Sequence, residues 1–153
     1  LDTRKTTPLI RFLEKEAVKI GGGVNHRYGL YDMIMLKDNH NDFAGGIENS
    51  INKTIQYLRE NNLNLKIEVE TRNIEEVKEV LEVGNIDRIM LDNFNYEDMR
   101  KAVKLINNQY ETEASGGINL ETVRKYAECG VDFVSVGALT HSVSNMDLSL
   151  KAI

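Results

Sequence analysis

The strongest constraint on the fold is a unit that repeats along the sequence, in which an apolar run ends in a polar or small residue. The runs at 31–36, 65–70, 86–93, 112–117 and 131–137 lead to Lys37, Glu70, Asp92, Ser115 and Gly137, which are spaced 33, 22, 23 and 22 residues apart. The first run is too continuous for a half-exposed strand and is typical of a strand covered on both faces. The regular spacing predicts parallel strands separated by helices.

Apolar residues recur at helical spacing between these runs. We expect helices between Thr7 and Gly21, Gly46 and Asn61, Asn73 and Gly84, Asn93 and Ile106, and Asn119 and Gly130. Residues 1–4 have the pattern of the tail of a further strand, residues 37–40 are predicted as a polar loop, and residues 146–150 as a short strand or a docking segment. About six parallel strands with intervening helices predict an α/β fold, an incomplete TIM-like barrel, in one domain over residues 1–153.

Composition and charge narrow the function classes. The chain carries one cysteine among 153 residues and a net charge of −5. A single cysteine excludes an internal disulfide and indicates a reducing compartment, the cytoplasm, while the acidic balance argues against nucleic-acid binding. No apolar run in the sequence approaches the roughly 18 residues of a membrane span. Residues 1–27 nonetheless carry six Lys and Arg against three Asp and Glu, which suggests a small anionic ligand.

Basic residues cluster on loops and strand ends that we expect to open onto one face of the barrel. Arginine binds carboxylate and phosphate oxygens through two parallel hydrogen bonds, and lysine supplies a point charge. For each residue alone a solvated loop position is the more ordinary interpretation, but their convergence on one rim favours an anion site. The residues are Arg4, Lys5, His26, Arg27, Lys37 and His40.

Two carboxylates, Glu70 and Asp92, end neighbouring strands. They are suited to Mg²⁺, to sugar hydroxyls or to a developing positive charge, and an ion pair with a nearby lysine is the alternative. Glu68 lies deeper in its strand and Asp87 begins its strand, so neither is expected to share this position.

Glycine-containing turns follow the last two predicted strands. Such turns can present backbone N–H groups to a phosphate, and phosphate sites after the last two strands recur in barrels. Glycine also serves simply as a turn residue, so either turn alone is weak evidence. Together with the cations and carboxylates, the turns predict a ligand with carboxylate and phosphate groups and a sugar. Their residues are Ser115, Gly116, Gly117, Gly137, Ala138, Leu139 and Thr140.

Seven segments closely resemble the quinolinate phosphoribosyltransferase family, in the same order and across essentially the whole chain. They are LDTRKTTP at 1–8, GGGVNHR at 21–27, LKDNH at 36–40, EVE at 68–70, LDN at 91–93, EASGGI at 113–118 and SVGALTH at 135–141. The resemblance implies the C-terminal barrel domain of a longer chain, whose N-terminal α/β domain of roughly a hundred residues is absent here. It also implies a homodimer or higher homo-oligomer with shared active sites, completed by an arginine of the partner subunit.

The resemblance further implies a reaction. Quinolinate attacks the anomeric carbon of phosphoribosyl pyrophosphate, pyrophosphate leaves with Mg²⁺, CO₂ is lost, and nicotinate mononucleotide forms, as a step of NAD biosynthesis. By the same resemblance, Arg4, His26, Arg27 and Lys37 bind the two quinolinate carboxylates, and Lys5 points toward the phosphates. Glu70 and Asp92 bind the ribose hydroxyls and Mg²⁺. Lys37, Glu70 and Asp92 are the expected catalytic residues, and residues 115–117 and 137–140 bind the 5′-phosphate.

Two alternatives remain open at this point. One is a paralogous phosphoribosyltransferase-like protein associated with molybdenum transport. The other is a non-catalytic, phosphate-binding barrel fragment. Retention of both carboxylates and all the cations disfavours the second alternative. In either case we expect residues 1–153 alone to turn over poorly, because the expected barrel is open and the basic segment starts at Leu1.

Overall fold

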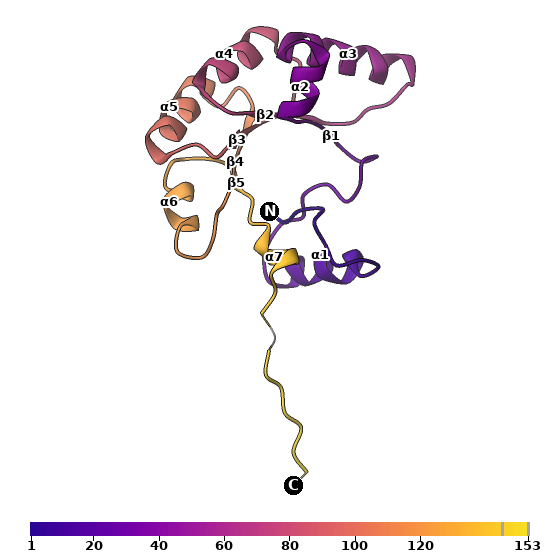
Figure 1. Ribbon diagram of the computed structural model, residues 1–153, viewed down its shortest axis with the longest axis vertical. Coiled ribbons are helices and arrows are strands. Elements are labelled where there is room, and N and C mark those ends of the chain that lie inside the picture. The colour runs from indigo at the N-terminus through magenta and orange to yellow at the C-terminus, as the bar shows by residue number, and fades with distance from the viewer. Residues whose placement is uncertain (145, 153) are drawn as a thin grey trace.

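The computed structural model describes residues 1–144 and 146–152, and it forms an open, curved parallel sheet with helices on its outer side (Figure 1). Chain order and spatial order of the strands are the same, as expected when each strand is followed by a right-handed crossover. The strands are β1 (Ile34–Leu36), β2 (Ile67–Thr71), β3 (Arg88–Asp92), β4 (Glu111–Ser115) and β5 (Phe133–Val134). The α/β class, the parallel strands and the incomplete barrel of the sequence analysis are confirmed.

Most of the helices lie along the outer side of the curved sheet, whereas the first and the last helix lie side by side near the start of the chain (Figure 1). The helices are α1 (Arg11–Ile20), α2 (Asp38–Ala44), α3 (Ile47–Glu60), α4 (Ile74–Val83), α5 (Tyr96–Ile106), α6 (Val123–Ala127) and α7 (Ala138–His141). Asn73 begins α4 as predicted, because its side chain accepts the Glu76 amide at 2.9 Å. Within the described residues, every helix falls short of the length and apolar character that a membrane crossing requires.

The two faces of the sheet differ in character because side chains alternate along each strand. The outward-facing Val69, Ile89 and Leu91 are fully buried and belong to one apolar core with residues of α3, α4 and α5, such as Ile51 and Met99. Burying apolar side chains between sheet and helices is the main force that stabilises this layer. The opposite face of the same strands is left for polar and charged residues, which line the inside of the open barrel.

The sixth strand, predicted to end within residues 1–4, is present only as one residue, Leu1, paired with β5. No strand is assigned at residues 1–4. The Leu1 amino group nevertheless donates to Val134 O at 2.6 Å, and the Val136 amide donates to Leu1 O at 3.0 Å. This is the pattern of a parallel ladder, so the start of the chain lies beside β5 at the edge of the sheet. A single paired residue is too short to count as a strand, and the described sheet has five strands.

The first strand is also shorter than predicted. The apolar run at 31–36 was expected to be covered on both faces, but β1 begins at Ile34 and its first two residues are only partly buried. Asp32 instead accepts the amides of Tyr28 and Gly29 at 2.6 and 2.9 Å, which forms a turn, and Tyr31 is 70% exposed. An edge strand needs less apolar cover than a central one, which explains the difference.

The structure differs in detail from the expected one at four further places. Thr7 does not cap α1, because its amide and hydroxyl donate to the Glu14 carboxylate at 2.9 and 2.6 Å, and α1 begins only at Arg11. Residues 38–44, expected as a loop at their start, form α2, and residues 138–141 form the short α7 beside α1 (Figure 1). Residues 146–152 contain neither a strand nor a helix.

A buried ion pair fixes the first residues of the chain to α1. The Lys15 ammonium donates to Asp2 Oδ1 at 2.7 Å and to His26 O at 3.0 Å, and both charged side chains are at most 2% exposed. Asp2 also accepts from Asn25 Nδ2 at 2.6 Å and from the His26 amide at 2.7 Å. The pair therefore joins the N-terminal segment, α1 and the loop at 24–27 into one unit.

We expect Lys15→Met to lower the free energy of unfolding by about 3 kcal/mol, because it leaves Asp2 as a buried charge without its cation. Lys19→Met is the matched control on the same helix, since Lys19 pairs with Glu16 in an exposed position, and should change stability by about 0.5 kcal/mol or less. Urea denaturation of both variants measures the difference. Equal losses of unfolding free energy in the two variants would show that the buried ion pair contributes no more to stability than the exposed one.

Candidate active site

A pocket of about 720 Å³ opens at the carboxyl ends of the strands. This is the edge at which ligands bind in parallel α/β folds. Its walls come from the residues that end each strand and from the N-terminal segment. Every predicted site residue except His40, Leu139 and Thr140 lines it, namely Arg4, Lys5, His26, Arg27, Lys37, Glu70, Asp92, Ser115, Gly116, Gly117, Gly137 and Ala138. The structure thus brings these residues together, while the role of each stays a prediction.

Two arginines, Arg4 and Arg27, line the pocket and lie close enough for their charges to repel each other. Arg4 Nε is buried and has no hydrogen-bond partner among the described residues. Arg27 donates to Met33 O at 3.2 Å. Burial lowers the pKa of Arg27, and the nearby charge of Arg4 lowers it further. Two guanidinium groups that repel each other, one of them with an unused buried donor, make a strong site for an anion.

The carboxylates lie on the strands opposite. Glu70 pairs with Lys37, whose ammonium lies 2.5 Å from Glu70 Oε2. Asp92 accepts a hydrogen bond from Asn93 Nδ2 at 2.7 Å. The ion pair that the sequence analysis named as the alternative for these carboxylates is therefore present at Glu70, with Lys37 as its partner. Lys37 is 46% exposed, so it can also reach a ligand in the pocket.

The first glycine turn requires glycine for a geometric reason. Gly116 has φ of +101° and Gly117 has φ of +59°, both in the region that favours glycine. A Cβ on Gly116 would collide with the Asn93 side chain and come within 2.8 Å of the Asn93 amide nitrogen. A Cβ on Gly117 would meet no atom within 4 Å. Gly116 is therefore needed for the close packing of the β3 and β4 ends.

The second turn is built differently. The amides of Leu139 and Thr140 donate to Val136 O and Gly137 O, at 3.2 and 3.1 Å, within the turn itself. Thr140 is buried, and its hydroxyl donates to Lys5 O at 2.8 Å. In this structure Leu139 and Thr140 therefore do not offer these groups to the pocket, and Thr140 instead fixes the backbone of Lys5. His40, expected among the rim cations, accepts the Lys37 amide at the start of α2 and does not line the pocket.

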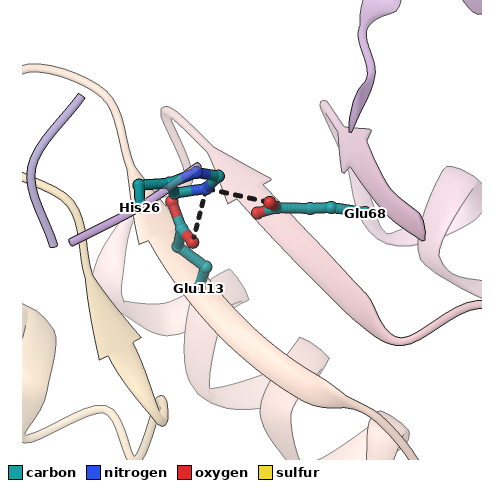
Figure 2. Close-up of side chains that lie close together, drawn as sticks. All are labelled: His26, Glu68 and Glu113. Carbon is teal, nitrogen blue, oxygen red and sulfur yellow. Dashed lines mark ion pairs between the residues drawn. The ribbon is translucent and has the colours of Figure 1, made fainter. Parts of the chain in front are cut away.

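A charged cluster at His26 was missed by the sequence analysis. His26 Nε2 lies 2.9 Å from Glu68 Oε2 and 3.3 Å from Glu113 Oε2, and Figure 2 shows the three side chains pointing toward one another from separate segments. Arg88 donates to Glu113 at 3.0 Å, and Ser135 donates to the other Glu113 oxygen. The sequence did contain a sign of this cluster, because charged residues occur at every second position of IEVE in β2 and ETE in β4 and therefore point to the same face of the sheet.

Burial and the two glutamates act in opposite directions on His26. Burial lowers the pKa of His26, but hydrogen bonds and charges of Glu113 and Glu68 outweigh it and raise the pKa to about 9. Nδ1 accepts the Arg27 amide at 2.7 Å, which assigns the proton of the neutral ring to Nε2. The hydrogen bond from the Arg27 amide partly opposes this increase in pKa, because it stabilises the neutral ring and an imidazolium cannot accept it.

The two glutamates differ in their preferred charge. Burial raises the pKa of both carboxyl groups. For Glu113 the hydrogen bond to His26 and further partners, including Ser135 and Arg88, outweigh burial, and its pKa is lowered. For Glu68 the charge of Glu113 adds to burial, and its pKa is raised. Among the described residues, His26, Glu68 and Glu113 are also close enough to share a metal ion, although Arg88 already neutralises part of the charge on Glu113.

Fold and site together define a class of protein: an incomplete α/β barrel with a pocket lined by arginines, carboxylates and a glycine turn at the carboxyl ends of its strands. The sequence matches the family model described as quinolinate phosphoribosyl transferase, C-terminal domain, over residues 1–151. The chain therefore belongs to the quinolinate phosphoribosyltransferase family, as the resemblance in the sequence had indicated.

Curated relatives agree with this assignment. The chain is 52% identical over 165 aligned residues to the chloroplastic nicotinate-nucleotide pyrophosphorylase [carboxylating] of Arabidopsis thaliana, which covers 99% of this chain and 47% of the relative. It is 46% identical to the probable nicotinate-nucleotide pyrophosphorylase [carboxylating] of Bacillus subtilis, covering 97% of this chain and 50% of the relative. The chain thus spans about half the length of the curated relatives that it matches.

Solved structures show the same fold. NadC from Streptococcus pyogenes superimposes with a TM-score of 0.90 at 40% identity, covering 99% of this chain and 52% of that chain. A thiamine phosphate pyrophosphorylase from Pyrococcus furiosus, with a TM-score of 0.53 and 21% identity over 90% of this chain and 70% of that chain, shares the fold alone.

We expect Gly116→Ala to destabilise the protein by about 3 kcal/mol, because it combines a strained positive φ with a collision against the Asn93 backbone. Gly117→Ala is the matched control, with a positive φ but open space around the new Cβ, and should lose about 1 kcal/mol. Denaturant unfolding of the two variants tests the difference. If Gly117→Ala were the more damaging substitution, packing against Asn93 would not be the reason for the glycine.

Proposed function

We propose that this chain is the barrel domain of an enzyme that transfers the phosphoribosyl group of phosphoribosyl pyrophosphate to quinolinate, with decarboxylation to nicotinate mononucleotide, pyrophosphate and CO₂. The observation that carries the proposal is the pair of arginines, with the unused buried Nε of Arg4, in the pocket of a chain whose relatives bear the name of this enzyme. The same names favour this reaction over the two alternatives of the sequence analysis.

Quinolinate carries two adjacent carboxylates, which suit a site made of two guanidinium groups. In the proposed complex Arg4 and Arg27 bind these carboxylates and Lys37 adds a third positive charge at the end of β1. Both ring nitrogens of His26 contact protein atoms in this structure, so a carboxylate reaches His26 only by displacing one of them. Glycosylation makes the ring nitrogen cationic, and this charge stabilises the electron pair that stays on the neighbouring ring carbon when the C–C bond breaks and CO₂ leaves; a proton then takes the place of CO₂.

Glu70 and Asp92 are proposed to act on the sugar. Loss of pyrophosphate leaves an oxocarbenium-like centre, which fixed carboxylates stabilise electrostatically. Asp92 Oδ1 has no partner among the described hydrogen bonds, whereas Glu70 is engaged by Lys37. Carboxylate oxygens are ligands that Mg²⁺ accepts, usually together with substrate phosphates. Asp92, with Glu70 beside it, would therefore hold the Mg²⁺ that neutralises the leaving pyrophosphate.

The glycine turn and Lys5 are proposed to bind phosphate. Residues 115–117 and Gly137 line the pocket near Lys5. The positive φ of Gly116 and Gly117 lets backbone N–H groups of this turn approach an anion closely. We therefore propose that the 5′-phosphate binds at this turn, beside Lys5.

We further propose that the site is completed by protein outside residues 1–153, in a homodimer or higher homo-oligomer. The support is the open barrel, the half-length match to relatives, and a group of large apolar side chains exposed on and beside α1. These are Leu9, Phe12, Leu13, Ile20, Leu30 and Tyr31. The single cysteine, Cys129, is free and buried, in keeping with the proposed reducing compartment, the cytoplasm.

We expect Lys37→Ala to weaken quinolinate binding by about tenfold, because it removes a charge-assisted contact to a carboxylate. Binding of phosphoribosyl pyrophosphate should change by less than about threefold, since its phosphates lie toward Lys5. Calorimetric titration with each ligand measures both constants. Lys66→Ala is the control, because Lys66 lines a separate pocket with Asp87 and Glu111. Equal losses for both ligands in Lys37→Ala would contradict the assignment.

We expect residues 1–153 alone to show little or no phosphoribosyl transfer. Joining the chain to the unmatched half of the Arabidopsis relative should raise turnover by at least about a hundredfold, because misplacement of reacting groups by about 1 Å has a cost of that order. Nicotinate mononucleotide formation and sedimentation of both proteins are the measurements. A monomeric 153-residue chain with the same turnover as the joined protein would overturn this part of the proposal.

A further inference from the structure

Glu68 and Glu113 lie on the inner face of the sheet, and the proposed reaction does not use them. Glu68 is on β2 and Glu113 is on β4, on either side of β3, and both are completely buried. The His26 ring is inserted between them, with Nε2 at 2.9 Å from Glu68 and 3.3 Å from Glu113 (Figure 2). Only Glu113 also lines the pocket.

Within the described residues, the His26 ring is the only group in short polar contact with Glu68, with Nε2 at 2.9 Å from Oε2, and neither carboxylate oxygen has a hydrogen bond of good geometry there. The negative charge of Glu68 also acts from a greater distance on Arg88 and Arg27, whose pKa values it raises. A buried carboxylate without hydrogen bonds is unfavourable for folding by itself. Its position therefore points to a role at His26 rather than to a general contribution to stability.

The opposite edge of the His26 ring is tied to Arg27. Nδ1 accepts the Arg27 amide at 2.7 Å, while the His26 amide and carbonyl are bound by Asp2 and Lys15. Rotating the ring would break the contact to the Arg27 backbone. Because Arg27 lines the pocket beside Arg4, the orientation of His26 is coupled to the place of one of the two anion-binding arginines.

We propose that Glu68 and Glu113 are positioning residues, which hold the His26 ring and thereby keep Arg27 in place to bind the carboxylates of the ligand. The inference rests on the proposed function of the pocket as a site for a pyridine dicarboxylate. The two glutamates do not touch that ligand, and they act on it through His26 and Arg27.

A positioning role of the two glutamates and a purely electrostatic role predict opposite changes in the affinity for the dicarboxylate. If the glutamates acted only as negative charges near a site for a dianion, their removal would strengthen dicarboxylate binding. If they position His26 and Arg27, their removal weakens it. The sign of the change in affinity therefore separates the two explanations without any assumption about its size.

The experiment uses the chain joined to the unmatched half of the Arabidopsis relative, because the proposed site is completed outside residues 1–153. Calorimetric titration with pyridine-2,3-dicarboxylate and, separately, with phosphoribosyl pyrophosphate is made above the His26 pKa of about 9, where the ring is neutral and Nδ1 can accept the Arg27 amide. Glu68→Met removes the carboxylate that contacts His26 alone, and an apolar side chain of similar length suits the buried position. Glu113→Gln removes the other contact. Glu111→Gln is the matched control, because Glu111 binds the same Arg88 from the same strand at 2.9 Å but does not contact His26.

We expect Glu68→Met and Glu113→Gln to weaken dicarboxylate binding by about tenfold, the loss typical of a hydrogen bond to a charged group. Phosphoribosyl pyrophosphate binding should change by less than about threefold, and Glu111→Gln should leave both affinities unchanged. Unchanged or stronger dicarboxylate binding in Glu68→Met would overturn the proposal, as would equal losses for both ligands.

Nuclear magnetic resonance of the His26 ring provides a readout that does not depend on the ligand. The charged groups that face His26 or its backbone are Glu68 on β2, Glu113 on β4, Arg88 on β3 through Glu113, Asp2, Lys15 and the neighbouring Arg27. We expect the His26 pKa, which these carboxylates raise to about 9, to fall in Glu68→Met and to stay in Glu111→Gln. An unchanged His26 pKa in Glu68→Met would contradict the positioning role.

The two readouts also separate this inference from the proposed function. The unsubstituted protein could fail to bind the dicarboxylate while the His26 pKa still falls in Glu68→Met. This result would count against the dicarboxylate site, but the glutamates would still be the groups that hold His26. Equal dicarboxylate affinities of the unsubstituted protein and Glu68→Met would support the dicarboxylate site and contradict the positioning role of Glu68.

Discussion

The arrangement of the pocket depends on one buried carboxylate, that of Asp2. It binds the ammonium of Lys15, the side chain of Asn25 and the backbone amide of His26. These contacts join the N-terminal segment, α1 and the loop at 24–27, and two of these segments carry an arginine of the pocket, since Arg4 follows Asp2 and Arg27 follows His26. A charge buried in a protein must be fully compensated, so this site tolerates little displacement. The geometry of the basic side of the pocket is therefore set by compensation of charge rather than by apolar packing.

The opposite side of the pocket is set by the sheet. Parallel strands end at the same edge, so Lys37, Glu70, Asp92 and Ser115 meet there although they are far apart in the sequence. Regular spacing of apolar runs made this part predictable. Each strand end was placed to within a few residues, and nearly all expected site residues line one pocket.

The sequence was less informative where neighbours in space decide the structure. Residues 38–44 contain few apolar residues, and α2 forms there because His40 accepts the amide of Lys37 at its start. The charged cluster at His26 was missed because its members are more than forty residues apart and each glutamate alone has the pattern of an ordinary strand residue. Only the combined alternation in β2 and β4 indicates that several strands direct charge inward. The sequence could not show that Leu139 and Thr140, unlike their neighbours, do not line the pocket. The reason is that their amides donate to carbonyl groups within the turn, which only the structure shows.

The pairing of Leu1 with β5 has a consequence for how the molecule assembles. The bonds from Leu1 to Val134 and from Thr140 to Lys5 join residues 133 and 135 positions apart, whereas neighbouring strands join residues about twenty to thirty-three apart. Contacts between distant residues require closure of a long loop and form slowly. The helices and central strands can therefore fold as a unit before the N-terminal segment docks. Because Arg4 and Lys5 belong to that segment, we expect the basic side of the pocket to form late in folding, and local opening of this edge to displace both residues while the core stays intact.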